Sequence, residues 1–522
     1  MAELIKVKNK NGTTYLYENK TIWDKELKKY KYKRTCVGKI NTNGETIMYD
    51  KKPKELLPPK FVKTFGNTYL LNSIGEKLGL NSILKNIFQD DYDVFITLVH
   101  YICCEDSSLS NTPKWMELNE TVLKTKLTTQ YISSFLKKIT EEQRLEFFKE
   151  WVKKRLEEEY IAFDITSISS YSKLIDLVEL GYNRDKEKLP QINMGMFFGE
   201  TSNLPIFYNT YPGSIKDVKT LKNMLTYCDI LNIKNIKFVM DKGFYSDQNI
   251  SDMLISKKKF TIAIPFKSAI ATSKVNQVRD IIKKPSNILT IGELVYGETI
   301  KEKWTVTLDD FKEKEYTVYY HVMYDSDKRN DAENILMARI MRKKKEFEEY
   351  VLKYNRMPKD LEKYEKYFKI NKRTKTISLL DDVIEEEMKN EGYMVIISND
   401  LTNVKDVFTT YRRKDVVEKS FDNMKNDLDF RRLRIHTEPS LKGKMFIVFI
   451  ALILKTYLYN KVIQNGLVKE YSTNEVLKEV QKIAKVVFSE ETSILSEVSS
   501  EQRKIFKLLE IKEPDIKECT LI

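Results

Sequence analysis

The sequence predicts a multidomain α/β protein (α+β over the whole chain) in which one mixed β-sheet is interrupted by a long insertion. Apolar, strand-like segments alternate with amphipathic helical segments between residues 160 and 265. A charged stretch over 268–393 breaks this alternation, and the strand rhythm returns at Tyr393–Ser398. Three strands followed by helix–strand–helix–strand are typical of a sheet with mixed strand directions.

Composition narrows the functional class. The 522 residues include 89 Lys and Arg against 76 Asp and Glu, a net charge of +13, and 42% are hydrophobic. This balance predicts a globular chain and favours a polyanionic partner such as nucleic acid. The five cysteines show no CxxC spacing and there are three histidines, which argues against a structural zinc site.

We expect a cytoplasmic protein without a membrane partner. Met1–Lys6 runs straight into a charged segment and shows no secretory signal. The longest apolar run, Met445–Leu454, stops at Lys455 and is about half of the roughly 20 residues that span a bilayer. This run is therefore expected to form a buried helix.

The N-terminal part divides into two predicted regions. Residues 1–62 form a basic β module, since the first 60 residues hold 15 Lys and Arg and 7 Asp and Glu, so that 8 of the 13 net positive charges lie there. This module either faces DNA or is a solvated lysine-rich surface. Residues 63–157 show helical periodicity, with two amphipathic helices separated at Gly79. The pair fits a helix-turn-helix DNA reader or part of a helical bundle.

Two acids stand out in the next region. Asp164 lies inside the apolar strand Tyr160–Thr166, where a carboxylate is costly unless it is paired or binds a metal. Asp241 ends the strand Ile236–Asp241, at the edge where α/β sheets open a crevice. If these strands are neighbours, the two carboxylates can share a hard cation such as Mg²⁺.

The insertion over 268–393 is expected to contain strands at Lys303–Leu308 and Tyr316–Met323 and a long charged helix from about Asp331 to Lys369. The charged helix is either a solvated face or a hairpin that grips DNA. Trp304 is either a core residue or a stacking residue for a base.

A third acid is expected on the helix that follows Asn403 and runs to about Leu428. Tyr411, Glu418 and Lys425 are spaced seven apart, and Lys414 precedes Glu418 by four, so all four share one helical stripe. An ordinary surface ion pair of Lys414 with Glu418 remains an alternative. Two acid clusters, Asp381-Asp382 and Glu385–Glu387, are rejected because they lack the aromatic and cationic companions.

Together these motifs resemble the DDE transposases of bacterial insertion sequences. The resemblance rests on three motifs: Phe163–Thr166, Val239–Phe244 and Tyr411-x2-Lys414-x3-Glu418-x6-Lys425. The last is similar to the Tyr-x2-Arg-x3-Glu-x6-Lys signature of the insertion-sequence-four type. Lys414 stands where that signature has arginine, and lysine cannot make the bidentate fork to phosphate. The segments Leu189–Gln191, Tyr211–Gly213 and Phe430–His436 add to the likeness, which spans about residues 65–455.

The resemblance implies a ribonuclease-H-like catalytic core built from 158–267 and 394–465, with 268–393 inserted. Separately, we expect a helical region over 466–522. The resemblance also implies that Asp164, Asp241 and Glu418 are catalytic and hold two Mg²⁺ ions, for which Mn²⁺ can substitute. Its implied DNA contacts are Tyr411, Arg412, Lys414, Lys425, Arg434 and His436.

The implied function is metal-dependent cleavage of DNA at transposon ends and strand transfer into target DNA. The expected partners are transposon-end and target double-stranded DNA, and a homodimer that pairs two ends. In a bacterial cell this places the protein on the nucleoid. Two alternatives remain: a ribonuclease-H-like nuclease without strand transfer, and a non-catalytic DNA-binding protein derived from a transposase. A generic RNA-binding protein is weaker, because no RNP or KH motif is present.

Overall fold

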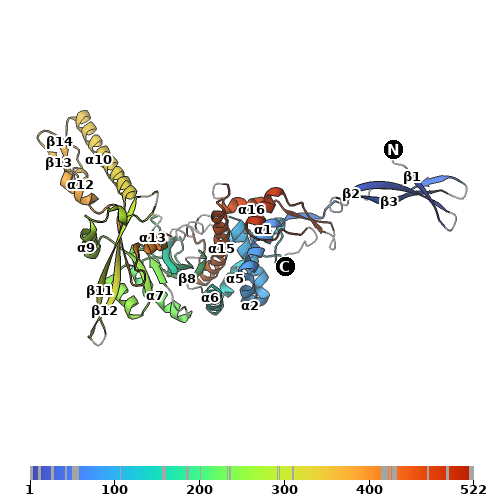
Figure 1. Cartoon of the computed structure of the whole chain (residues 1–522), viewed down its shortest axis with the longest axis horizontal. Helices are drawn as coiled ribbons and strands as arrows, with labels where there is room; N and C mark the ends of the chain where they lie inside the picture. Colours follow the sequence, from blue (N-terminus) through green and yellow to red (C-terminus); the bar gives the residue numbers. More distant parts are fainter. Residues whose placement is uncertain are drawn as a thin grey trace. The chain divides into compact units, whose positions relative to one another are not determined.

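The protein is known here from a computed structural model (Figure 1). The structure describes residues 4–9, 13–24, 29–40, 44–49, 58–105, 107–155, 160–183, 187–199, 202–231, 233, 237–290, 292, 294–308, 311–412, 421, 425, 432–466, 470–488 and 493–515. The chain forms two compact units: one holds residues 1–62 and 486–493, and the other holds 63–485 and 494–522.

The first unit contains an antiparallel sheet in the order β1-β2-β3-β4. Its strands are β1 (Leu4–Lys8), β2 (Thr14–Asp24), β3 (Lys29–Ile40) and β4 (Thr46–Met48). Leu16 and Val37 are its buried apolar residues among those described. Close packing of β3 on β4 explains the glycine at position 38, since a Cβ atom there would lie 2.7 Å from the carbonyl oxygen of Ile47 on β4.

Helices dominate the start of the second unit. They are α1 (Gly66–Leu78), α2 (Leu80–Phe88), α3 (Tyr92–Cys104), α4 (Thr112–Leu118), α5 (Thr129–Lys138) and α6 (Glu141–Arg155). The predicted break between the first two helices is confirmed at Gly79, which caps α1 with a φ of 67°. Glycine is favoured there because left-handed backbone carries no steric penalty for it.

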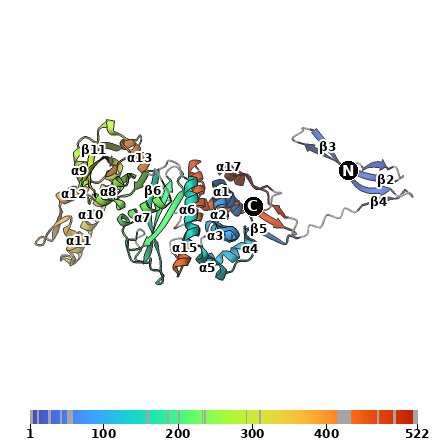
Figure 2. The same ribbon diagram turned by 90° about the horizontal axis from the view of Figure 1, so that it is seen from below.

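The central helix of this unit is α15 (Glu438–Gln464), which is packed inside the protein as expected for the apolar run. Figure 2 shows it beside α6, and Phe446 on α15 contacts Phe147 on α6. Among the described residues α15 is long and apolar enough to cross a membrane, but 78% of its most apolar stretch is buried in the protein. Gly443 allows a close approach to α5, since a Cβ there would lie 2.1 Å from the carbonyl oxygen of Leu136.

The described residues form a large mixed sheet of eight strands in the order β11-β12-β15-β10-β9-β6-β7-β8. Strands β10, β9 and β6 run parallel, and the strands outside them pair antiparallel. The strands are β6 (Tyr160–Ser169), β7 (Gln191–Gly199), β8 (Pro205–Pro212), β9 (Lys237–Met240), β10 (Lys259–Ile264), β11 (Val295–Thr307), β12 (Glu313–Asp325) and β15 (Tyr393–Ser398). The mixed directions expected from the sequence are confirmed.

Short helices connect these strands. The predicted helices between β8 and β10 are confirmed as α7 (Asp217–Ile230) and α8 (Asp247–Ile255), and α9 (Ala269–Val278) follows β10. On the far side of the insertion, α13 (Val404–Arg412) begins the helix expected after Asn403. Its predicted continuation to Leu428 falls largely outside the described residues.

The insertion has two parts. Its strands β11 and β12 join the large sheet through β15, so they extend this sheet and form no sheet of their own. The rest packs around a separate apolar core that includes Ile340, Phe347 and Tyr364. Its members are α10 (Ser326–Tyr354), α11 (Glu362–Glu365), β13 (Phe368–Asn371), β14 (Thr376–Leu379) and α12 (Asp381–Met388). Figure 1 shows α10, β13, β14 and α12 together, and Figure 2 shows α11 beside α10.

Two predictions of secondary structure need correction. The charged helix expected to run to Lys369 ends at Tyr354, because Asn355 adopts a left-handed φ of 47° and Pro358 follows. The C-terminal region expected to be helical contains α16 (Thr473–Gln481) and α17 (Ser500–Leu508), but also β16 (Ala484–Val487) and β17 (Ser493–Leu495). These two strands form a small sheet with β5 (Phe61–Thr64).

A buried histidine ties the insertion to the segment that leads into α13. The Nε2 atom of His321 on β12 lies 3.0 Å from the carbonyl oxygen of Leu401, and Nδ1 lies 3.0 Å from the Thr299 hydroxyl on β11. A carbonyl only accepts, so Nε2 carries the proton and Nδ1 accepts from Thr299. The neutral ring makes both bonds, and burial, which lowers the pKa of His321 to about 4, keeps the ring neutral.

We expect the free energy of unfolding to fall as the pH is lowered from 6.5 to 5. Burial also lowers the pKa of His100 to about 3, and its ring nitrogens have no hydrogen-bond partner among the described residues. The unfolded chain binds protons below about 6.5, whereas the folded chain does so only near 3 to 4. Each histidine therefore contributes a slope that rises to about 1.4 kcal/mol per pH unit as the pH approaches 5. Urea unfolding at several pH values measures it.

His100→Leu is the matched variant for this test. It removes one of the two titrating groups, so the slope between pH 6.5 and 5 should be roughly halved. An unfolding free energy that stays constant over this pH range in the wild-type chain would contradict the assignment of two neutral buried histidines.

Candidate active site

The two predicted acids lie side by side at the centre of the large sheet. Strands β6 and β9 are parallel neighbours, and Phe163 pairs with Met240 in their register. Asp164 and Asp241 each follow one of these paired residues, so they occupy the same level on adjacent strands. Residues at one level of neighbouring strands point to the same face of a sheet. The structure thus brings together two acids that are 77 residues apart in the chain.

Local hydrogen bonds orient both carboxylates. Oδ1 of Asp164 accepts the backbone N–H of Ile165 at 2.8 Å, and Oδ1 of Asp241 accepts that of Lys242 at 2.7 Å. Asp164 is buried, with 8% of its surface exposed, and Asp241 is half-buried. Gly243 completes the tight turn after Asp241: a Cβ atom there would lie 2.9 Å from a carboxylate oxygen of Asp217.

A tyrosine from the other side of the insertion reaches the same position. The Tyr411 hydroxyl on α13 donates to Oδ1 of Asp241 at 3.1 Å. Helix α13 is held against the insertion strands β11 and β12, where Val404 and Val407 pack on Met323 of β12. The insertion strands therefore support the helix that carries Tyr411.

A cleft of about 710 Å³ opens beside Asp241 and Tyr411. Its floor is apolar, with Ala263 and Met323 buried. Its rim carries charged side chains of both signs and exposed aromatic surface. The charged lining residues besides Asp241 are Lys242, Lys267, Asp325, Lys328 and Glu391.

The donors at this edge of the sheet suit a hard divalent cation. Carboxylate oxygens are the ligands that Mg²⁺ prefers, and it is usually bound through one or two of them. Asp164 on β6 and Asp241, directly after β9, supply two carboxylates. The predicted third acid, Glu418, and Lys414 lie outside the described residues. The part of the chain that is described holds no cluster of three side chains able to bind a metal.

The segment 432–436 runs beside the far end of β6. Arg432 forms an isolated parallel bridge with Ser169, and the backbone N–H of Leu433 donates to the Ser169 carbonyl at 3.2 Å. The Arg432 guanidinium makes a bidentate pair with Glu187, at 2.7 and 2.8 Å, and Lys444 donates to the Leu433 carbonyl at 2.9 Å. Contact with Glu187 raises the pKa of Arg432.

The predicted DNA-binding residues occupy different environments. Arg412 is exposed on α13, one residue after Tyr411. Arg434 and His436 are exposed on the segment anchored at Ser169, which lies about 16 Å along β6 from Asp164. Lys425 is buried, with 7% of its surface exposed. A contact to a DNA phosphate needs a lysine at the surface. Their roles as DNA contacts stay predictions.

Trp304 and the acid cluster of α12, both considered in the sequence analysis, form ordinary contacts within the protein. The Trp304 indole is half-buried and donates to the Ser251 hydroxyl on α8 at 3.1 Å, in agreement with a packing role. In the rejected acid cluster of α12, Glu387 pairs with Lys366 and Arg339. Contact with Lys366 lowers the pKa of Glu387, which fits an ordinary ion pair.

A family model described as a transposase DDE domain matches residues 156–454 of this sequence. The chain belongs to the DDE transposase family. The match begins just before β6 and ends within α15, so it includes both acids, Tyr411 and the whole insertion. No curated protein matches this chain.

A solved structure of the piggyBac transposase in a synaptic complex with hairpin DNA is similar to this transposase at a low level. The two are 8% identical, the match covers 80% of this chain and 70% of that chain, and the TM-score is 0.35.

Several residues of the site were not singled out from the sequence. The pair of Arg432 with Glu187 joins residues 245 apart, and no local pattern marks it. His321 lies in a strand of ordinary composition, so its bridge to Leu401 is visible only in the fold. Lys242 stood in the recognised Val239–Phe244 motif, and its place on the cleft rim could have been proposed from that motif.

We expect Glu187→Gln to lower the free energy of unfolding by roughly 1–2 kcal/mol, because it removes the negative charge from a bidentate, half-buried ion pair. The two side chains are 27% and 26% exposed. Urea unfolding measures the change.

Glu315→Gln is the matched control, since it breaks an ion pair with Lys303 whose side chains are 54% and 69% exposed. Exposed pairs contribute little, so this variant should change stability by less than about 0.5 kcal/mol. Equal effects of the two variants would contradict an anchoring role for the Arg432–Glu187 pair.

Proposed function

We propose that this DDE transposase cuts DNA at the ends of its own element and joins these ends to target DNA. The observation that carries the proposal is the placement of Asp164 and Asp241 at one level on adjacent parallel strands. The proposal includes a ribonuclease-H-like core and membership of the insertion-sequence-four type, which rest on the motifs around Asp164, Asp241 and Tyr411.

The carboxylates of Asp164 and Asp241, with Glu418 as the proposed third acid, would hold divalent cations, Mg²⁺ or in its place Mn²⁺. When bound, such ions activate a hydroxyl for attack on phosphorus and neutralise charge on the leaving oxygen. The chain's own contribution is to fix the carboxylates. Backbone N–H groups orient Oδ1 of each aspartate, and the Tyr411 hydroxyl holds Asp241 from the helix side. No nucleophilic side chain is required.

The proposed substrate is double-stranded DNA from transposon ends and from a target site. Lys242, Lys267 and Lys328 on the rim of the cleft provide positive charge next to Asp241, where backbone phosphates would lie. Arg412, Lys414, Lys425, Arg434 and His436 are the further proposed contacts. Pairing of two ends implies a homodimer, and activity on chromosomal DNA implies a cytoplasmic, nucleoid-associated protein.

We expect Asp164→Asn and Asp241→Asn each to lower the rates of cleavage and joining by about 1,000-fold or more. The reason is that losing a metal ligand removes several kcal/mol of transition-state stabilisation. The assay uses duplexes that carry the terminal sequences of the element, with Mg²⁺ present. Glu391→Gln is the control, because Glu391 lines the same cleft from an exposed turn and should retain activity.

The products decide between the functions. Joined strands from the wild-type chain that are lost in both aspartate variants support the transposase. Cleavage without any joining indicates a ribonuclease-H-like nuclease, and DNA binding without cleavage indicates a non-catalytic derivative; either outcome overturns the proposal.

We expect Tyr411→Phe to raise the Mg²⁺ concentration that gives half-maximal cleavage by roughly 10-fold or more. Partners that orient a metal-binding carboxylate typically contribute 10- to 100-fold to metal affinity or activity. The variant keeps the aromatic ring against the apolar cluster that includes Met323 and Ile396, and it removes the hydroxyl that bonds Asp241. An unchanged Mg²⁺ requirement with weaker DNA binding would show instead that Tyr411 acts on DNA.

A further inference from the structure

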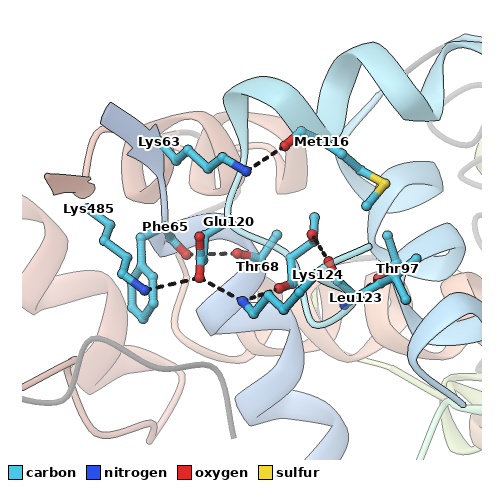
Figure 3. Close-up of polar contacts among 10 residues, drawn as sticks. Lys63, Phe65, Thr68, Thr97, Met116, Glu120, Leu123, Lys124 and Lys485 are labelled. Carbon is cyan, nitrogen blue, oxygen red and sulfur yellow. Dashed lines mark hydrogen bonds and ion pairs between the residues drawn. The ribbon is translucent and has the colours of Figure 1, made fainter. Parts of the chain in front are cut away.

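A group of lysines surrounds one buried glutamate on the helical part of the chain, away from the acids of the large sheet (Figure 3). Lys124 lies 2.7 Å and Lys485 lies 3.1 Å from the same carboxylate oxygen of Glu120. The Glu120 side chain is 9% exposed and that of Lys485 is 12% exposed. Lys63 comes from β5 into the same group, where its Nζ atom donates to the Met116 carbonyl at 2.9 Å.

Hydrogen bonds to the backbone help to fix this arrangement. The N–H of Glu120 donates to the Thr64 carbonyl at 2.8 Å, which fixes the loop after α4 against β5. Lys124 also donates to the Thr121 carbonyl at 2.6 Å. The three lysines therefore come from three elements, β5, the loop before α5 and β16, and their positions do not depend on one flexible segment.

Positive charge exceeds negative charge at this point. Four lysines (Lys63, Lys124, Lys126 and Lys485) and two glutamates (Glu117 and Glu120) leave two net positive charges. These charges are close enough to shift one another's pKa values. Burial lowers the pKa of Lys63, Glu120 opposes this, and Lys124 and Lys485 lower it further. Burial by itself raises the pKa of Glu120, but its bonds to the two lysines lower it overall. An additional anion would relieve the repulsion among the lysines.

A half-open cavity of about 240 Å³ gives an anion access to these charges. Lys63, Glu120 and Lys124 line it, and the exposed side chains of Glu117 and Lys126 also belong to its lining. Lysine binds phosphate as a point charge, so a tetrahedral oxyanion needs no planar fork at this site.

We propose that this cavity, here called the Lys63–Lys124–Lys126 pocket, binds a phosphate group of the DNA backbone and so positions the helical part of the chain on its substrate. The inference rests on the proposed function, since it takes DNA as the source of the phosphate. Contacts of this kind fix the orientation of a protein on a duplex and carry no sequence information.

The test is the salt dependence of DNA binding by the full chain. The probes are two fluorescent duplexes of unrelated random sequence, titrated at NaCl concentrations from 50 to 300 mM. The pocket variant Lys124→Gln/Lys126→Gln should bind both duplexes more weakly by a similar factor. The slope of log K against log[NaCl] should become shallower by about 0.9, the loss of one phosphate contact.

Two further variants make the test specific. Lys504→Gln/Lys507→Gln removes the same charge from exposed positions of α17 and should leave the slope unchanged. Glu117→Gln removes a negative charge from the pocket and should tighten binding. A pocket variant that matches the α17 variant in slope and affinity overturns the proposal.

A last comparison separates DNA from free phosphate. Inorganic phosphate is added to both chains and their melting temperatures are measured. If phosphate raises the melting temperature of the wild-type chain but not of the pocket variant, and the salt slope of DNA binding is the same in both, the pocket is a site for a small anion. This result would overturn the DNA assignment. Failure of the proposed function itself would give a different result. In that case the wild-type chain would bind neither duplex, which would refute DNA as the substrate.

Discussion

The structure depends on the parallel, in-register pairing of β6 with β9. This pairing sets Asp164 and Asp241 at one level, with the first buried and the second half-buried. Two carboxylates held this way repel one another unless positive charge lies close to both. Their fixed positions have no evident role in packing, since the neighbouring residues Phe163 and Met240 supply the apolar contacts. We propose that this arrangement serves to bind a hard cation.

The insertion is best understood as part of the same site. Strands β11 and β12 lengthen the large sheet beyond β15, and α13 packs on both of them. His321 of β12 bonds the Leu401 carbonyl just before that helix begins. The insertion therefore fixes where α13 starts and how Tyr411 meets Asp241. A change far from the acids in sequence, within β11 or β12, can displace a group that touches one of them.

The central strands of the large sheet and the positions of the two acids could be predicted from the sequence. The apolar rhythm around Asp164 and the acid at the end of the Asp241 strand are local patterns, and the sheet confirms that the strands are neighbours. The connection of β11 and β12 to that sheet could not be predicted, since β12 pairs antiparallel with residues of β15 that lie 69 to 79 positions later, and such pairing leaves no local pattern. Tyr411 stood out by its spacing, but its bond to Asp241 depends on how α13 is seated. The end of α10 at Tyr354 could not be predicted either, because it depends on the left-handed turn at Asn355 while the charged sequence pattern continues past that residue. The domain boundaries and the roles of Glu418 and Lys414 stay predictions.

The central claim, that Asp164 and Asp241 share one cation, can be measured without knowing the DNA substrate. Fe²⁺ with ascorbate generates hydroxyl radicals that cut a polypeptide close to the bound iron. In the full chain we predict backbone cuts near both residue 164 and residue 241, suppressed by excess Mg²⁺ and lost together in Asp164→Asn and in Asp241→Asn. Cuts near one position that persist after the other aspartate is replaced would contradict a shared site.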